Sequence, residues 1–119
     1  MEMLARQFKG LSDATRLRIL NLLSEGELCV CDLMEVLDMP QSTISRHLSY
    51  LRNAGWIDSR KSGRWNYHRR ATAPTAFQAY AFAMLDDHLT DVPTAKIDKE
   101  KLEQRLAQKA GGTCADACA

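Results

Sequence analysis

MPQSTISRHLSYLRNAG, residues 39–55, decides the fold, because it carries the start and stop signals of one amphipathic helix. A proline suits the first helical turn, and the closing glycine suits the position just past the helix end. At about 100° per residue, Ile44, Leu48 and Leu51 fall on one narrow stripe. Short polar and cationic side chains occupy the opposite face. The stretch therefore predicts a helix with one core face and one face that offers hydrogen-bonding groups.

The segments around this helix predict further helices and one hairpin. Apolar residues recur at helical spacing in residues 2–10, 12–26, 30–37, 74–89 and 95–109. Residues 56–70 change to aromatic, strand-like composition around a Lys-Ser-Gly-Arg turn, which is typical of a β-hairpin. The predicted fold is mainly α with a small β-hairpin.

The whole chain has an ordinary globular composition. Its 119 residues are 45% hydrophobic and 26% charged, which fits one domain that would gain from pairing with a second copy. No run reaches the roughly 20 apolar residues that span a bilayer, and the start lacks a basic-then-apolar export signal. We therefore expect a cytoplasmic protein with no membrane partner. In a reducing cytosol, four cysteines favour metal, metalloid or redox chemistry over a disulfide framework.

The net charge of +1 hides a strong asymmetry along the chain. Residues 25–38 contain five carboxylates and no Lys or Arg, whereas residues 41–70 contain seven Lys or Arg and one Asp. A basic block of this kind is either a solvated face or a surface for a phosphate backbone. Three helices followed by a hairpin favour DNA, because the polar helix can enter the major groove. The expected fold class is a winged helix-turn-helix.

Two groups of side chains are candidates for contact with double-stranded DNA. On the polar face of the 39–55 helix, the candidates are Gln41, Ser42, Thr43, Ser45, Arg46, Ser49 and Arg52. At the tip of the hairpin, Lys61 and Arg64 are placed to hold phosphates. The planar donors of Arg46 suit a bidentate contact with guanine or phosphate. We expect His47, which lies beside the apolar stripe, to be packed and hydrogen bonded rather than to read bases.

The sequence resembles the ArsR family of metalloregulatory repressors, also called ArsR/SmtB, and is most similar to its arsenic-responsive members. The likeness rests on CVCDL at residues 29–33 and STISRHLSYLRNAG at residues 42–55, and in element order it extends over about residues 4–90. The resemblance implies a homodimer on a palindromic operator. Such a dimer represses a metalloid resistance operon and leaves the DNA when As(III) or Sb(III) binds cysteine thiolates.

The helix pattern and the resemblance together divide the chain into three parts. Residues 1–92 are expected to form the winged helix-turn-helix domain, which binds DNA and dimerises through its terminal helices. Residues 93–110 are expected to form a C-terminal amphipathic helix, and residues 111–119 a flexible tail with two cysteines. The broad apolar face of residues 74–89 itself favours a partner surface.

Cys29 and Cys31 are the first candidate ligands for the inducer. Two residues apart in a helix, their side chains would diverge by about 200°, so both can hold one ion only where the helix start is unwound. Thiolates select soft ions such as As(III), Sb(III), Cd(II) or Pb(II). Binding would then favour a distorted helix start and a conformer that does not hold DNA. The alternative is that both cysteines are small buried hydrophobic residues.

The arsenic-responsive pattern commonly has a third cysteine where this chain has Met34. A thioether is a poor partner for As(III), so we expect Met34 to belong to the core. The tail would supply the missing sulfur through Cys114 or Cys118, since two glycines precede it. Alternatively, two sulfurs bind and water or a buffer thiol completes the site, while the tail cysteines stay idle or form their own pair.

Some of these residue types are also found in other kinds of metal site and thiol protein. A second site class of the family, patterned D-x-H, is half present at Asp86 and His88, but Lys99 and Leu102 stand where its other ligands would be. We therefore expect Asp86 and His88 to be solvated and no zinc or cobalt site there. A Cd(II), Pb(II) or Zn(II) sensor using the cysteines and a thiol redox sensor are alternatives. A thiol enzyme or metallochaperone is disfavoured, because it leaves the basic block unexplained.

Overall fold

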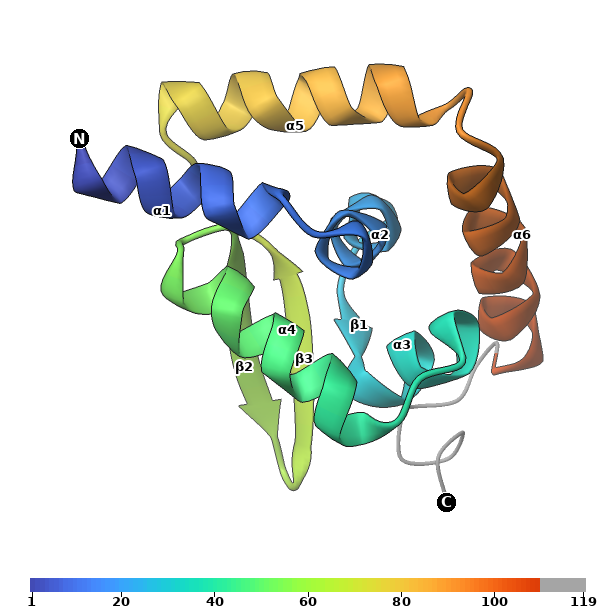
Figure 1. Ribbon diagram of the computed structural model, residues 1–119. Helices are drawn as coiled ribbons and strands as arrows, with labels where there is room; N and C mark the ends of the chain where they lie inside the picture. The colour runs from blue at the N-terminus through green and yellow to red at the C-terminus, as the bar shows by residue number, and fades with distance from the viewer. Residues whose placement is uncertain (110–119) are drawn as a thin grey trace.

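The computed structural model describes residues 1–109 of the chain. In this part the elements are α1 (Glu2–Leu11), α2 (Ala14–Leu22), the 3-10 turn η1 (Leu23–Glu25), β1 (Leu28–Cys29), α3 (Val30–Leu37), α4 (Gln41–Asn53), β2 (Ile57–Ser62), β3 (Trp65–Arg70), α5 (Ala76–Leu89) and α6 (Pro93–Gln108). Figure 1 shows α1 and α5 along one edge, α4 over the β2–β3 hairpin, and α6 beside α3. This arrangement confirms the winged helix-turn-helix. No helix within residues 1–109 has both the length and the hydropathy needed to span a bilayer.

Helix α4 begins and ends where its sequence signals place it. Pro40 is its N-cap in extended geometry, and Gly55 follows its last turn with a φ of +82°, a left-handed conformation that glycine tolerates. Ile44, Leu48 and Leu51 are buried, which confirms the predicted apolar stripe. The stripe anchors α4 to the core and leaves its opposite face open.

The sheet of the wing contains one strand more than the sequence predicted. β2 and β3 form the expected antiparallel hairpin around a tight turn at Gly63, which has a φ of +63°. On the other side of β3, Leu28 and Cys29 of β1 pair antiparallel with its middle, so the strand order is β1-β3-β2. The predicted hairpin is therefore confirmed, and β1 adds a third strand to it. A strand of two residues is too short to show the alternation by which strands are recognised in a sequence.

Trp56 is fully buried where α1, α5 and the start of the wing meet. Its indole N–H donates to the carbonyl of Gln7 (2.8 Å), and the rings of Phe77 and Phe82 lie 5.9 and 5.4 Å from its centroid. A Cβ atom at Gly10 would approach the indole to 2.9 Å, so α1 packs this closely only because it has glycine there. These contacts hold the two terminal helices of the winged domain against the wing.

Helix α6 is tied to the rest of the domain by ion pairs between distant residues. Arg18 on α2 donates two hydrogen bonds to Asp98 (2.9 and 3.0 Å), whose side chain is 1% exposed. One residue further on, Lys99 pairs with Glu25 at 2.7 Å. Leu102 adds a buried apolar contact. Helix α6 therefore packs along α2 and α3 and closes one side of the domain (Figure 1).

Candidate DNA-binding surface and thiol site

The polar face of α4 is open to solvent. Its exposed candidates are Gln41, Ser42, Arg46 and Arg52, and its half-buried candidates are Thr43, Ser45 and Ser49. At about 100° per residue, Ser42, Thr43, Ser45, Arg46 and Ser49 lie away from the buried stripe of α4, whereas Gln41 and Arg52 lie beside it. Short side chains beside the guanidinium groups of Arg46 and Arg52 suit a helix that enters the major groove, because they allow close approach to base edges.

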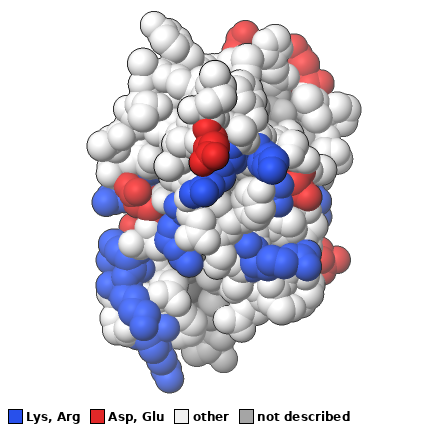
Figure 2. Space-filling model, turned by 60° about the vertical axis from the view of Figure 1, so that its left-hand side comes forward, with Lys and Arg blue, Asp and Glu red and all other residues white. Residues whose placement is uncertain are grey.

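The wing extends the basic surface away from α4. Lys61 and Arg64 are exposed beside its tight turn, and the Arg64 guanidinium lies 5.6 Å from the centroid of the Trp65 ring. Figure 2 shows Lys and Arg side chains across the middle of one face, where some carboxylates lie beside them, and along its lower protrusion, where no carboxylate is seen. A surface of this kind can bind a phosphate backbone and release its counterions.

Part of the basic block is already neutralised within the fold. Arg60 donates to both carboxylate oxygens of Glu27 (2.8 and 2.6 Å), and this contact holds the pKa of Glu27 below its usual value. Arg70 binds Asp86 in the same bidentate way (2.9 and 2.7 Å). Within residues 1–109, no ion pair engages the other five basic residues of the block, Arg46, Arg52, Lys61, Arg64 and Arg69. The charge that faces DNA is thus smaller than the sequence alone suggests.

His47 is packed against α2 and does not lie on the open face of α4. Its side chain is largely buried, and its Nδ1 atom lies 3.8 Å from the carboxylate of Asp13. Burial lowers the pKa of His47, although Asp13 acts in the opposite direction. The predicted packing is confirmed, but the buried Nδ1 atom has no hydrogen-bond partner among the described residues.

Cys29 and Cys31 lie on either side of the boundary between β1 and α3. Cys29 is the N-cap of α3, has extended backbone angles (φ −90°, ψ 166°) and is 1% exposed. Cys31 is the second residue of the helix and lines an open cavity. Both residues are disulfide-bonded in the structure, so the expectation of thiols without disulfides does not hold for this state. Cys29 is therefore buried in the core, whereas Cys31 is half-buried and borders the cavity.

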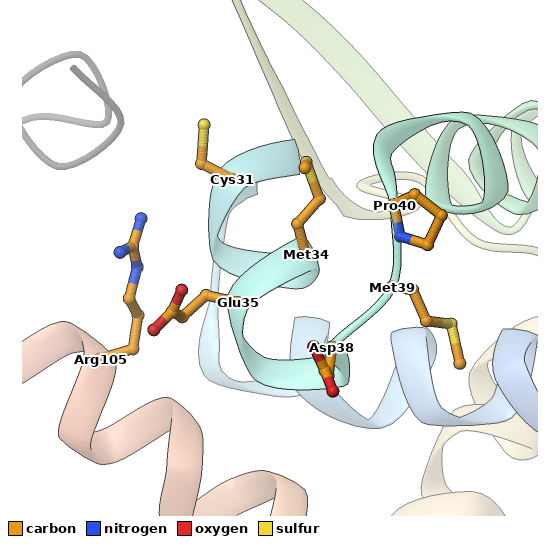
Figure 3. Close-up of a pocket in the computed structure, with 7 residues that line it drawn as sticks. All are labelled: Cys31, Met34, Glu35, Asp38, Met39, Pro40 and Arg105. Atoms are coloured by element: carbon orange, nitrogen blue, oxygen red, sulfur yellow. The ribbon is translucent and has the colours of Figure 1, made fainter.

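The cavity beside α3 has a volume of about 540 Å³. It is lined by Cys31, Met34, Glu35, Asp38, Met39, Pro40 and Arg105. Figure 3 shows the sulfur atoms of Cys31 and Met34 on one side of α3, while Asp38 and Met39 point the other way. Met34 packs against the core and also borders this cavity, so its prediction as a core residue is confirmed in part.

Asp32 is a buried carboxylate between the two cysteines and α6, and sequence reasoning missed it. It is 1% exposed, and its Oδ2 atom accepts the backbone N–H of Cys29 at 3.1 Å. Its Oδ1 atom accepts hydrogen bonds from Arg105 Nε (3.0 Å) and Lys109 Nζ (2.7 Å). Asp32 stands three positions after the N-cap residue Cys29, where a carboxylate can accept the N–H of the N-cap residue. This spacing was the signal available in the sequence. The two cations lie more than 70 residues away along the chain, and no local pattern indicates them.

The other candidate ligands do not form a site within the described part of the chain. Asp86 is held by Arg70 and is not simply solvated as predicted, because β3 brings the guanidinium beside α5. His88 is exposed, as predicted. No three His, Cys, Asp or Glu side chains among residues 1–109 converge as a metal site. Cys114 and Cys118 lie outside the described residues, so their role as ligands stays a prediction.

A polar helix anchored on an apolar stripe and followed by a basic wing defines the class of winged helix-turn-helix DNA-binding regulators. Residues 13–59 match the family model described as bacterial regulatory protein, arsR family. An arsenical resistance operon repressor from Escherichia coli (strain K12) is 57% identical over 63 residues, which are 52% of this chain and 54% of that protein. A homologue of the cadmium resistance transcriptional regulatory protein CadC from Staphylococcus aureus is 46% identical over 65 residues, 54% of each chain. The chain spans about half the length of these curated relatives.

A solved structure from Mycobacterium bovis has the same fold. It is the homodimeric winged helix-turn-helix DNA-binding domain of a possible ArsR-family transcriptional regulator. The two chains superpose with a TM-score of 0.65 at 29% identity, over 77% of this chain and 82% of the other. The chain belongs to the ArsR family. The two curated relatives and the structural neighbour are all named as transcriptional regulators or repressors.

Proposed function

We propose that the protein is a homodimeric transcriptional repressor of an arsenic or metalloid resistance operon, released from its operator by As(III) or Sb(III). It acts in the cytoplasm on palindromic double-stranded DNA. The polar face of α4 reads the major groove, and Lys61 and Arg64 of the wing hold phosphates. Cys29 and Cys31, once reduced, bind the inducer. The similarity to the arsenical resistance operon repressor of Escherichia coli supports this proposal.

The short link between α3 and α4 is the observation that carries the proposal. Helix α3 ends at Leu37 and α4 begins at Gln41, and Asp38 between them has the left-handed φ of 53°. Leu33 of α3 and Ile44 of α4 are buried in the same core. Because only residues 38–40 join two helices that share one core, a change in the position of α3 is passed on to α4. An inducer that prefers the changed α3 must therefore weaken DNA binding by an equal coupling free energy.

Two alternatives keep the same fold and the same operator binding. The Staphylococcus aureus relative is named for cadmium resistance, which supports Cd(II), and with it Pb(II) or Zn(II), as the inducer. A sensor in which the cysteine thiols are oxidised is the second alternative. The third sulfur of an As(III) site would come from Cys114 or Cys118 of the tail, or a water or small thiol would replace it.

Release of DNA by different ions tests the proposal directly. A fluorescent duplex is first selected from random sequences for binding to the protein, which is kept reduced with a phosphine. Fluorescence anisotropy then follows release as As(III), Sb(III), Cd(II), Pb(II) or Zn(II) is added, and, in a separate reduced sample from which the phosphine has been removed, as peroxide is added. We expect As(III) and Sb(III) to release the duplex at lower concentrations than the divalent ions. Release by Cd(II) or by peroxide alone would select the corresponding alternative.

Three variants of the chain assign the ligands in the same assay. Cys29→Ser and Cys31→Ser should bind the duplex but no longer respond to As(III). A chain that ends at residue 110 should need more As(III) if the tail supplies a sulfur, and should respond normally if it does not. Unchanged release of the duplex by As(III) in both serine variants would contradict the assignment of the inducer site to these cysteines.

A further inference from the structure

The backbone between the two cysteines determines whether their sulfurs can reach one ion. Side chains two residues apart share a face in an extended strand but diverge in a helix. Cys29 is already extended and paired in β1, whereas Cys31 lies within the first turn of α3. Lengthening β1 by Val30 and Cys31 would bring both sulfurs to the same side. The smallest change that forms a two-sulfur site is therefore loss of the first turn of α3.

The same change removes Asp32 from its place as the cap of α3. In the helical state, the carboxylate of Asp32 reaches back to the N–H of Cys29 at 3.1 Å because it stands three residues after it. Three residues along an extended strand cover about 10 Å, too far for this hydrogen bond. The carboxylate would also leave the ammonium of Lys109, which it contacts at 2.7 Å. Both sets of contacts are thus specific to the helical state.

We propose that Asp32 is a positioning residue of the inducer site, which latches the start of α3 to the end of α6 and must be released before both sulfurs bind one ion. The inference rests on the function proposed above. It adds to the ligands Cys29 and Cys31 a residue that keeps their side chains from converging. The free energy of the latch is subtracted from the binding free energy of the ion, because the binding-competent state is populated less. The latch therefore sets the inducer concentration at which the DNA is released.

The surroundings of the latch make its ion pairs stronger than ordinary surface pairs. The side chain of Asp32 is 2% exposed, and those of Arg105 and Lys109 are 12% and 14% exposed. Partly enclosed pairs are screened less by water and salt than exposed ones. Figure 3 shows Arg105 reaching from α6 toward α3. Helix α6 thereby becomes part of the sensor and is more than an addition at the end of the winged domain.

Lys109→Met separates the latch from an electrostatic effect on the thiols. If Lys109 mainly stabilised the thiolates, its removal would weaken As(III) binding. If it mainly holds the latch closed, its removal tightens As(III) binding. Lys99→Met is the matched control, because it makes the same substitution at a lysine within α6, whose C-cap is Lys109, and also breaks an ion pair, that with Glu25. Purely structural damage would affect both variants alike and would not tighten binding.

The experiment compares the reduced full-length protein with these two variants and with Asp32→Asn. As(III) affinity is measured by isothermal titration, and amide hydrogen exchange of residues 29–33 is measured without any inducer. We expect Lys109→Met to bind As(III) about threefold to fivefold more tightly and to exchange faster at these amides by a similar factor. Asp32→Asn should change both quantities in the same direction and by more. Lys99→Met should match the unmodified protein in both.

Unchanged or weaker As(III) binding by Lys109→Met would overturn the latch, as would equal changes in Lys99→Met. Failure of the unmodified protein to bind As(III) would overturn the proposed inducer instead. The exchange comparison needs no ion, so it still decides in that case whether Lys109 holds the start of α3. Exchange at residues 29–33 that is the same in all four proteins would overturn the latch independently of the inducer.

Discussion

His68 is held neutral in the middle of the sheet. Its ring is 4% exposed, Nδ1 lies 2.7 Å from the hydroxyl of Ser59, and Nε2 has no partner among the described residues. Burial, with a smaller contribution from Arg52, lowers the pKa of His68 to about 4. The unfolded chain therefore binds a proton at a higher pH than the folded chain does. Stability from His68 is complete above the unfolded pKa of 6.5 and is lost as the pH falls toward 4.

The pH dependence of unfolding tests the state of His68. Between pH 7.5 and pH 5, the unmodified protein should lose about 2 kcal/mol more unfolding free energy than His68→Asn, which keeps a polar atom near Ser59 but does not titrate. Urea unfolding followed by circular dichroism at both pH values gives the difference. His88→Asn, at an exposed position on α5, should lose as much stability as the unmodified protein. Equal losses in all three proteins would show that His68 is not neutral in the fold.

Arg46 and Lys61 are expected to contribute to DNA binding in different ways. Arg46 lies on the exposed face of α4 and Lys61 beside the wing turn. Arg46→Ala should cost about 2 kcal/mol on the selected duplex and little on random DNA, because a bidentate contact to a base is lost. Lys61→Ala should weaken both duplexes alike and reduce the slope of log K against log salt by about 1. Anisotropy titrations at several salt concentrations separate the two, and identical behaviour would contradict the assignment of Arg46 to bases.

The candidate residues differ in how far sequence could predict them. The face of α4 was predictable because one helical period fixes both its buried and its open side, as Ile44 and Arg46 illustrate. The ion pairs of Arg60 and Arg70 could not be predicted, because their carboxylate partners belong to other parts of the chain. Asp32 has a local capping signal, but its role depends on cations that only the packing of α6 brings near. Contacts made by folding over long distances have no local signature in a single sequence.

For the helices and strands, the length of the hydrophobic pattern decided which elements could be predicted from the sequence. Helix α4 and the wing hairpin each span enough residues to show a period and to carry turn residues at their ends. Strand β1 has two residues and no period, and it exists only because β3 offers it a free edge. The consequence for function is direct, since β1 places Cys29 in extended geometry at the start of α3.

Helix α6 is predicted to depend on its buried ion pair with α2. Arg18 is the bidentate partner of Asp98, whose side chain is 1% exposed. Arg18→Met leaves that carboxylate buried without a counter-charge and should lower the unfolding free energy by about 2–3 kcal/mol. The double variant Arg18→Met with Asp98→Leu should recover much of the loss, because no charge then remains buried. Denaturant unfolding of the three proteins checks this, and a loss below 1 kcal/mol for the single variant would contradict it.

At the scale of the whole molecule, α1 and α5 leave an apolar surface without a partner in the single chain. They lie together, with the rings of Phe8 and Phe77 5.1 Å apart between centroids. The outer sides of these helices expose several large apolar side chains, Met1, Met3, Leu4, Phe8, Tyr80 and Met84. Monomeric proteins rarely leave such a surface uncovered. A second copy of the chain would cover it, and the structural neighbour from Mycobacterium bovis is homodimeric.

A single charge on this surface should therefore separate the two copies and abolish tight DNA binding. Met84→Glu places a carboxylate on the exposed side of α5, where the residue is 52% exposed, so the monomer should fold normally. Ile97→Glu on α6 is the matched control, since Ile97 is 51% exposed on a different face. Sedimentation velocity should find monomers only for Met84→Glu. Because a monomer holds one half-site and loses the benefit of the linked second one, its affinity for a palindromic duplex should fall by about 100-fold or more. A Met84→Glu protein that is still dimeric would contradict the assignment of this surface to the dimer. A monomeric protein that binds the palindrome as tightly as before would contradict the need for a dimer.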